Sequence, residues 1–159
     1  MDVEHISRLK GNIVLVGVGN AMRGDDGAGP ALIRELKAQV GDEHPRITMI
    51  DAGEVPENFL MDIVARKPDV IVFIDAADFH APPGATRLIE SNEVHGGGLS
   101  THNASLKLSM DFLRMETKSD ILLLGIQPAH TRLGEGISEP VKNAIENVLN
   151  FLMENISNA

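Results

Sequence analysis

Short apolar runs alternate along the chain with segments in which apolar residues recur every three or four positions. Four runs rich in Val, Ile and Leu are nearly continuous in apolar residues, which predicts strands that are covered on both faces. These runs are residues 13–18, 47–51, 70–75 and 121–126. The segments with helical spacing are residues 31–40, 57–66, 104–115 and 139–153.

Alternation of strands and helices predicts a parallel sheet with helices on both faces. Residues 85–89 differ, because they are short, half polar and preceded by a Pro-Pro-Gly turn, which is typical of an antiparallel edge strand. No repeat or linker divides the 159 residues. We therefore predict a single α/β domain over residues 1–159, with residues 1–10 as an N-terminal extension. Its predicted architecture is a three-layer sandwich around a twisted, mostly parallel five-stranded sheet with one antiparallel edge strand.

Composition narrows the possible partners. The formal net charge of -9 argues against nucleic acid, because phosphate binding needs a basic face. The chain has no cysteine, which excludes disulfides, a thiolate nucleophile and metal sites built on sulfur. No run approaches the roughly 20 apolar residues of a membrane span, and the first ten residues do not resemble a secretion signal. We expect a cytoplasmic protein without a membrane partner, and nothing in the pattern marks a dimer face.

A glycine-rich turn, residues 19–30, follows the first predicted strand. It carries two adjacent carboxylates, so a cation, or a group bound to a cation, suits it better than an anion. The turn also fails two nucleotide-binding templates. Met22 stands where a dinucleotide fingerprint has its third glycine, and Asp25 and Asp26 replace the Lys-Ser/Thr pair of a P-loop. We therefore expect no nucleotide cofactor.

Three predicted strands end in acids or lead to them. The first leads to Asp25 and Asp26, the second ends at Asp51 and the third ends at Asp75. Open α/β sheets bind ligands beyond this carboxyl edge, and Asp26 and Asp75 converge if the first and third strands are neighbours. A single strand-terminal aspartate more often caps a helix or turn. Several at one edge make a functional site and a structural role about equally plausible.

His102 lies just before the predicted helix 104–115. The positive end of a helix dipole disfavours imidazolium, so this side chain keeps a lone pair for a ligand. Considered alone, it is more simply a polar residue at a helix start. Together, Asp26, Asp75 and His102 form an oxygen, oxygen and nitrogen set that suits nickel or zinc.

Several blocks of sequence, in a fixed order, carry a family resemblance. They are residues 18–20 with 24–30, 51–53 with 56–58, 74–76, 101–103 and 124–128. Over residues 13 to about 153 the chain resembles the hydrogenase maturation endopeptidases, which process [NiFe] hydrogenases. It is most similar to the formate hydrogenlyase (hydrogenase 3) type.

This resemblance implies a twisted five-stranded sheet between helices and a specific endopeptidase activity. Members cut a short C-terminal peptide from the precursor of the hydrogenase large subunit once nickel has been inserted. The resemblance implies that Asp26, Asp75 and His102 contact the metal, and we assign the catalytic role to the same three residues. Other branches have glutamate at the position of Asp26. Residues 129–136 differ among members, which makes them candidates for substrate contact.

Our hypothesis is that the nickel arrives with the precursor, held by its cysteines, and that the protease completes its coordination. Nickel would then polarise the scissile carbonyl while one carboxylate serves as general base for water. We assign Gly19, Asn20, Asp25 and Asp51 to substrate binding, with the amides of Gly19 and Asn20 as donors to the oxyanion.

Two functions from other classes remain open at this stage. A nickel chaperone would bind the metal and leave the length of the precursor unchanged. A receiver-like phosphoacceptor domain also gathers acids after its first and third strands, but it normally has a lysine after its fifth. Here Gln127 and Pro128 follow the last predicted strand, which weakens this alternative.

Overall fold

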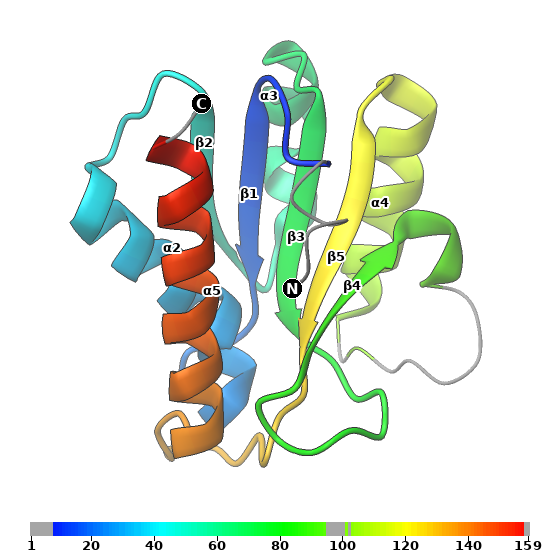
Figure 1. Cartoon of the computed structure of the whole chain (residues 1–159). Coiled ribbons are helices and arrows are strands. Elements are labelled where there is room, and N and C mark those ends of the chain that lie inside the picture. Colours follow the sequence, from blue (N-terminus) through cyan, green and yellow to red (C-terminus); the bar gives the residue numbers. More distant parts are fainter. Residues whose placement is uncertain (1–7, 95–100, 102, 158–159) are drawn as a thin grey trace.

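The structure is a computed structural model that describes residues 8–94, 101 and 103–157. Five strands form one sheet in the order β2-β1-β3-β5-β4 (Figure 1). The strands are β1 (Ile13–Val18), β2 (Ile47–Gly53), β3 (Val70–Ala76), β4 (Thr86–Glu90) and β5 (Asp120–Ile126). Strands β2, β1, β3 and β5 are parallel, and β4 pairs antiparallel with β5 at the edge.

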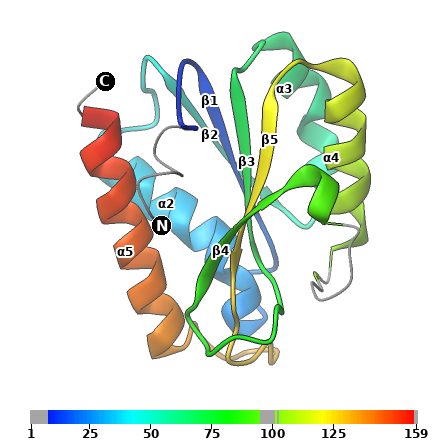
Figure 2. The ribbon, with the colours of Figure 1, turned by 45° about the vertical axis from the view of Figure 1, so that its right-hand side comes forward.

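Helices cover both faces of this sheet, as the two views in Figures 1 and 2 show. The α-helices are α2 (Ala28–Val40), α3 (Leu60–Ala65), α4 (Ala104–Glu116) and α5 (Glu139–Ser157). Three single turns of 3-10 helix are η1 (Gly24–Gly27), η2 (Pro56–Phe59) and η3 (Ser91–Glu93). Helices α2 and α5 lie on one face, and α3 and α4 lie on the other. The predicted three-layer architecture is confirmed.

Strand β1 is buried along its whole length, because alternate side chains enter two separate cores. Ile13 and Leu15 pack with α2 and α5, whereas Val14, Val16 and Val18 pack with α3 and α4. The continuous apolar runs of the sequence therefore belong to strands covered on both sides.

The boundaries of several elements differ from those predicted. The segment 57–66 is a 3-10 turn, η2, followed by the short helix α3, and α2 begins at Ala28 rather than residue 31. Helix α5 continues to Ser157. Helix ends depend on local capping and tertiary contacts that apolar spacing does not encode.

The order of the strands positions a site at one end of the sheet. From β1 the chain continues to β2 on one side and then returns to β3 on the other side. The connections after β1 and β3 therefore diverge at the carboxyl edge, which is the place where open α/β sheets bind ligands.

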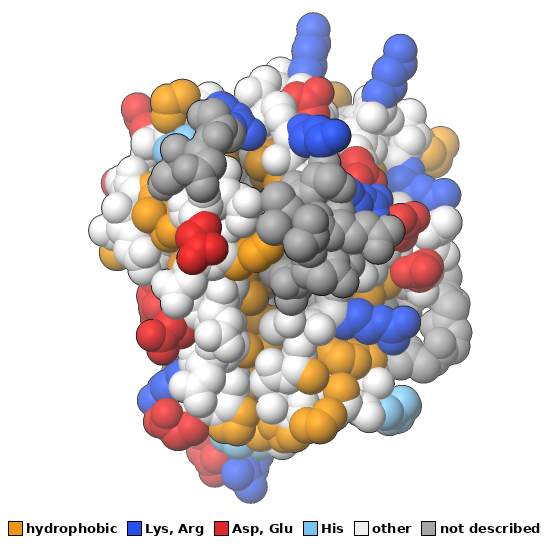
Figure 3. Space-filling view, viewed as in Figure 1, with side chains coloured by type: hydrophobic (Ala, Val, Ile, Leu, Met, Phe, Trp, Pro, Cys, Tyr) orange, Lys and Arg blue, Asp and Glu red, His pale blue; other side chains and the backbone are white. Residues whose placement is uncertain are grey.

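The outer surface is mixed in charge. On the face shown in Figure 3, acidic side chains lie along the side that α5 occupies in Figure 1, with basic ones scattered between them. Within the described part of the chain, no helix has the length and apolar character needed to cross a bilayer.

Candidate active site

Asp26 lies on the turn that leaves β1. It belongs to η1 and is half-buried, and its Oδ2 accepts a hydrogen bond from the Asn20 amide at 2.9 Å. Gly19 makes this turn possible, since its φ is 139° and a Cβ atom there would collide with the carbonyl oxygen of Asp26. Glycine at position 19 therefore lets the backbone fold back and place Asp26 above the end of β1.

Asp75 is the second-to-last residue of β3 and is only 1% exposed. The Thr101 hydroxyl donates to its Oδ2 at 2.6 Å, whereas its Oδ1 has no hydrogen-bond partner within the described residues. Burial raises the pKa of Asp75 to about 8; the Thr101 hydrogen bond opposes this rise, and the charge of Asp26 adds to it. With its pKa near 8, Asp75 is mostly protonated at neutral pH.

The two acids meet at the carboxyl edge because β1 and β3 are adjacent and parallel. A Cβ atom built on Gly19 would lie 3.7 Å from Asp75 Oδ1, so this unpaired oxygen faces the turn that carries Asp26. The assignment of both acids to metal contact stays a prediction.

His102 lies outside the described residues. Its described neighbours are Thr101, which contacts Asp75, and Asn103, which accepts the Leu106 amide and caps α4. Within the ranges that the structure describes, no three His, Cys, Asp or Glu side chains form a group that could hold a metal. Of the three predicted metal-contacting residues, the structure therefore describes Asp26 and Asp75.

Asp25 lies in a different environment from Asp26, and its assignment to substrate binding stays a prediction. Its side chain is fully buried and accepts hydrogen bonds from the amides of Ala129, His130 and Ser138 and from the Ser138 hydroxyl. Burial raises the pKa of Asp25, but these bonds outweigh it and leave the pKa below its ordinary value. Asp25 therefore anchors residues 129–138 to η1 through these hydrogen bonds.

The two amides expected to stabilise an oxyanion already have acceptors. Gly19 N–H donates to the Gly53 carbonyl at 2.8 Å, and Asn20 N–H donates to Asp26. Both amides are therefore occupied in this conformation, and the expectation of an oxyanion hole there stays a prediction. Asp51 is exposed on β2, where it accepts the Gly53 amide and lies 3.9 Å from Arg34 Nη1. Its assignment to substrate binding stays a prediction.

Comparison with known proteins places this site in a family. A family model for HycI, hydrogenase maturation protease, matches residues 30–155. The hydrogenase 3 maturation protease of Escherichia coli (strain K12) is 35% identical over 136 residues, which are 85% of each chain. The chain belongs to the hydrogenase maturation proteases. As a member of this family it is a peptidase, which argues against the chaperone and phosphoacceptor alternatives.

Solved structures of maturation proteases have the same fold. The [NiFe] hydrogenase maturation protease HycI from Thermococcus kodakarensis KOD1 aligns with a TM-score of 0.86 and 34% identity, over 98% of both chains. The hydrogenase maturating endopeptidase HybD from E. coli aligns with a TM-score of 0.70 over 90% of this chain and 93% of its own. At 22% identity the second likeness shows the fold alone.

The site of this maturation protease includes one contact that sequence reasoning missed. Thr101 stands beside His102 in the sequence, and nothing in its spacing indicates that its hydroxyl reaches Asp75, 26 residues earlier. The sequence offered one hint of this contact, which is that a residue with a hydroxyl group stands next to the candidate ligand His102. That Asp75 is the partner of Thr101 can be seen only in the folded protein, because the pairing of β1, β3 and β5 brings the start of α4 to the end of β3.

Proposed function

We propose that this protease removes the C-terminal extension of a [NiFe] hydrogenase large-subunit precursor after nickel has been inserted. Family membership supports the processing of a hydrogenase precursor. The observation that supports the nickel-dependent part is Oδ1 of Asp75, which is buried beside Asp26 and has no partner among the described residues. A buried carboxylate oxygen without a partner costs free energy, and a cation brought by the substrate would satisfy it.

The proposed role of the nickel is to distinguish a precursor that has received its metal from one that has not. Cysteines of the precursor hold the ion, and Asp26, Asp75 and His102 complete its coordination. Nickel suits this mixture of oxygen, nitrogen and sulfur ligands. A precursor without nickel would bring no cation to Asp26 and to Asp75 Oδ1, so its binding would be weaker.

The same arrangement would carry the hydrolysis. Nickel polarises the scissile carbonyl, and one of the two carboxylates takes a proton from the attacking water. The carbon–nitrogen bond then breaks as the leaving amine takes up a proton. The products are a new C-terminal carboxylate on the large subunit and a released peptide.

Substitution Asp26→Asn tests this function. The amide keeps the size of the side chain but removes its charge, so processing of nickel-loaded precursor should slow by about 100-fold or more. The measurement is the mass of the precursor over time, with nickel-loaded and nickel-free precursor compared for each enzyme. Asp62→Asn on α3, an exposed acid paired with Arg66, is the matched control and should cut at the unmodified rate.

Two outcomes would contradict the proposal. One is undiminished cleavage by the Asp26→Asn variant. The other is equal cleavage of nickel-free and nickel-loaded precursor by the unmodified enzyme, because the ion would then have no part in recognition.

A further inference from the structure

The carboxylate of Asp75 has two oxygens in different surroundings. Oδ2 accepts the Thr101 hydroxyl at 2.6 Å, and Oδ1 faces the Gly19 turn without a partner in the described residues. Because the Thr101 hydroxyl already occupies Oδ2, Oδ1 is the oxygen of this side chain that has no partner among the described residues and can accept a further group. One hydrogen bond thus determines which oxygen faces the site.

The direction of the Thr101 hydroxyl is itself fixed. Its Oγ1 accepts the Asn103 amide at 3.3 Å, which leaves its hydrogen to point at Asp75. Asn103 is held in turn, since its Oδ1 accepts the Leu106 amide and its Nδ2 donates to the Glu54 carbonyl. A chain of hydrogen bonds therefore runs from the start of α4 to the end of β3.

We propose that Thr101 is a positioning residue of the protease, which holds Asp75 with Oδ1 presented to the substrate. Thr101 does not itself touch the reacting atoms. Its hydroxyl keeps Asp75 from rotating, so that the orientation of the carboxylate is established before the precursor binds. This inference rests on the proposed function, because it assumes that Asp75 acts on the substrate.

The simpler alternative is that Thr101 only stabilises the turn before α4. Its Oγ1 accepts an amide two residues later, as threonine commonly does in such turns. A purely local role would lower the stability of the fold and leave the catalytic rate of the folded protein unchanged. A positioning role would lower kcat and affect precursor binding much less.

The test compares Thr101→Val, Thr101→Ser and Thr117→Val. Valine keeps the shape of threonine without the hydroxyl, and serine keeps the hydroxyl. Thr117 is a matched control, because its hydroxyl also makes a 2.6 Å hydrogen bond, to the Leu113 carbonyl at the far end of α4. The measurements are kcat and KM with nickel-loaded precursor, and the melting temperature of each variant.

We expect Thr101→Val to lower kcat by about 10–100-fold with KM changed less than about threefold. Thr101→Ser should stay within about threefold of the unmodified kcat, and Thr117→Val should cleave at the unmodified rate. Melting temperatures show whether each variant is folded at the assay temperature. If Thr101→Val does not fold, Thr101→Ser must still restore both folding and kcat for the inference to stand.

Two results would overturn the inference. The first is an unchanged kcat for Thr101→Val, and the second is an equal loss of kcat in Thr101→Ser and Thr101→Val. Asp75→Asn is measured beside them to separate the two proposals. If Asp75→Asn is inactive while Thr101→Val is fully active, only the positioning role fails. If Asp75→Asn is fully active, the proposed function fails as well.

Discussion

Three aspartates near the carboxyl edge of the sheet have different surroundings. Asp25 and Asp26 are adjacent in the sequence. The side chain of Asp25 is fully buried and accepts several hydrogen bonds, whereas Asp26 is half-buried and accepts one from the Asn20 amide. Asp75 lies on a neighbouring strand, and one of its oxygens has no partner in the part of the chain that the structure describes. Their roles follow from the groups that surround each carboxylate.

The pH dependence of stability tests the environment of Asp75. Its pKa of about 8 in the folded protein lies above the ordinary value of about 4. The stability linked to this group is therefore fully present below pH 4 and is lost as the pH rises toward 8, since the unfolded chain ionises first. The free energy of unfolding of Asp75→Asn relative to the unmodified protein should rise by roughly 4 kcal/mol from pH 4 to pH 8.

Denaturant unfolding at a series of pH values measures this difference. Parallel stability curves for the two proteins would contradict the raised pKa. Titration of the Asp75 carboxyl carbon by NMR provides an independent check, and its midpoint should lie well above 4.

The predicted strand ends and the fold class were enough to predict that Asp26 and Asp75 lie close together. They were not enough to separate Asp25 from Asp26, because the groups that bury Asp25 come from Ala129, His130 and Ser138, more than 100 residues away. The same limit applies to Thr101. Apolar spacing identifies elements and their edges, but it carries no information about hydrogen bonds between distant loops.

At the scale of elements, the start of α2 packs unusually close to the sheet. Gly29, in the first turn of α2, faces Gly17 of β1, and a Cβ atom on Gly17 would lie 2.6 Å from the Gly29 carbonyl oxygen. The pattern of glycines did not fit a dinucleotide fingerprint. Gly29 nevertheless performs the task of the third glycine in that fingerprint, which is close packing of helix on strand.

Substitution Gly29→Ala tests this contact. The added Cβ would collide with the Ile74 carbonyl oxygen and lie 2.6 Å from the Val18 carbonyl oxygen, and backbone atoms cannot move aside as a side chain can. The clash should outweigh the roughly 1 kcal/mol that alanine gains over glycine in a helix. We expect a net loss of about 1–3 kcal/mol, measured by denaturant unfolding.

Gly136→Ala is the control for this prediction, because nothing lies within 4 Å of a Cβ atom at that position. Its stability should stay within about 0.5 kcal/mol of the unmodified protein. Equal stability of the two variants would show that α2 can shift away from the sheet at little cost.

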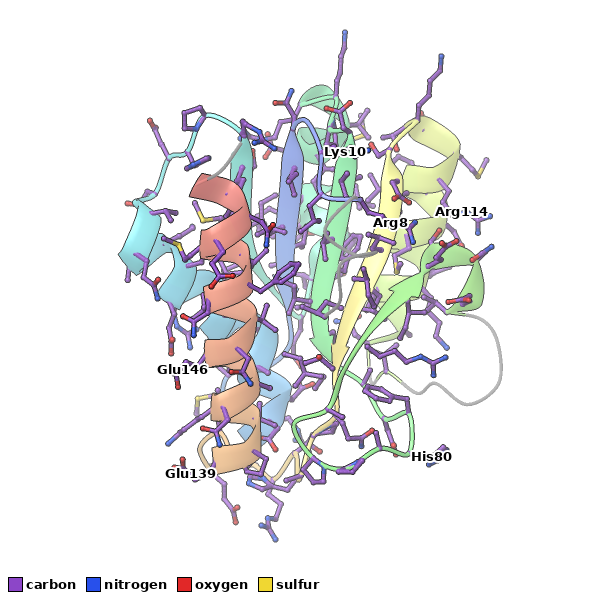
Figure 4. The ribbon with its side chains drawn as sticks, in the orientation of Figure 1. Arg8, Lys10, His80, Arg114, Glu139 and Glu146 are labelled. Atoms are coloured by element: carbon purple, nitrogen blue, oxygen red, sulfur yellow. The ribbon has the colours of Figure 1, made fainter. Side chains whose placement is uncertain are left out.

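At the scale of the whole molecule, the described ion pairs of the N-terminal extension lie at the opposite end from the acids. Arg8 makes two hydrogen bonds to Asp120, the first residue of β5, and one to Glu90, the last residue of β4. Figure 4 shows Arg8 in the upper part of the molecule and His80, in the loop after β3, at its lower end. Arg8 thus links the edge strand β4 to β5 at the end of the sheet opposite the site.

Substitution Arg8→Ala should therefore affect stability without affecting catalysis. Loss of these partly exposed ion pairs should cost about 1 kcal/mol, and the cost should shrink in high salt. Thermal unfolding at low and high salt measures the cost, and kcat should be unchanged. Arg114→Ala is the control, since Arg114 has a single 3.9 Å ion pair with Asp111. A lower kcat in a fully folded Arg8→Ala variant would contradict the claim that the contacts of Arg8 do not influence the active site at the other end of the sheet.

The anchoring of residues 129–138 has a consequence for engineering. Asp25 holds this segment chiefly through the main-chain amides of Ala129, His130 and Ser138, and only the Ser138 hydroxyl adds a side chain. The amino acids between these anchor points can therefore be exchanged without breaking the anchors. Grafting residues 131–137 from another maturation protease, with Gly134 kept, would therefore test whether this segment contacts the substrate while its anchors to Asp25 stay in place.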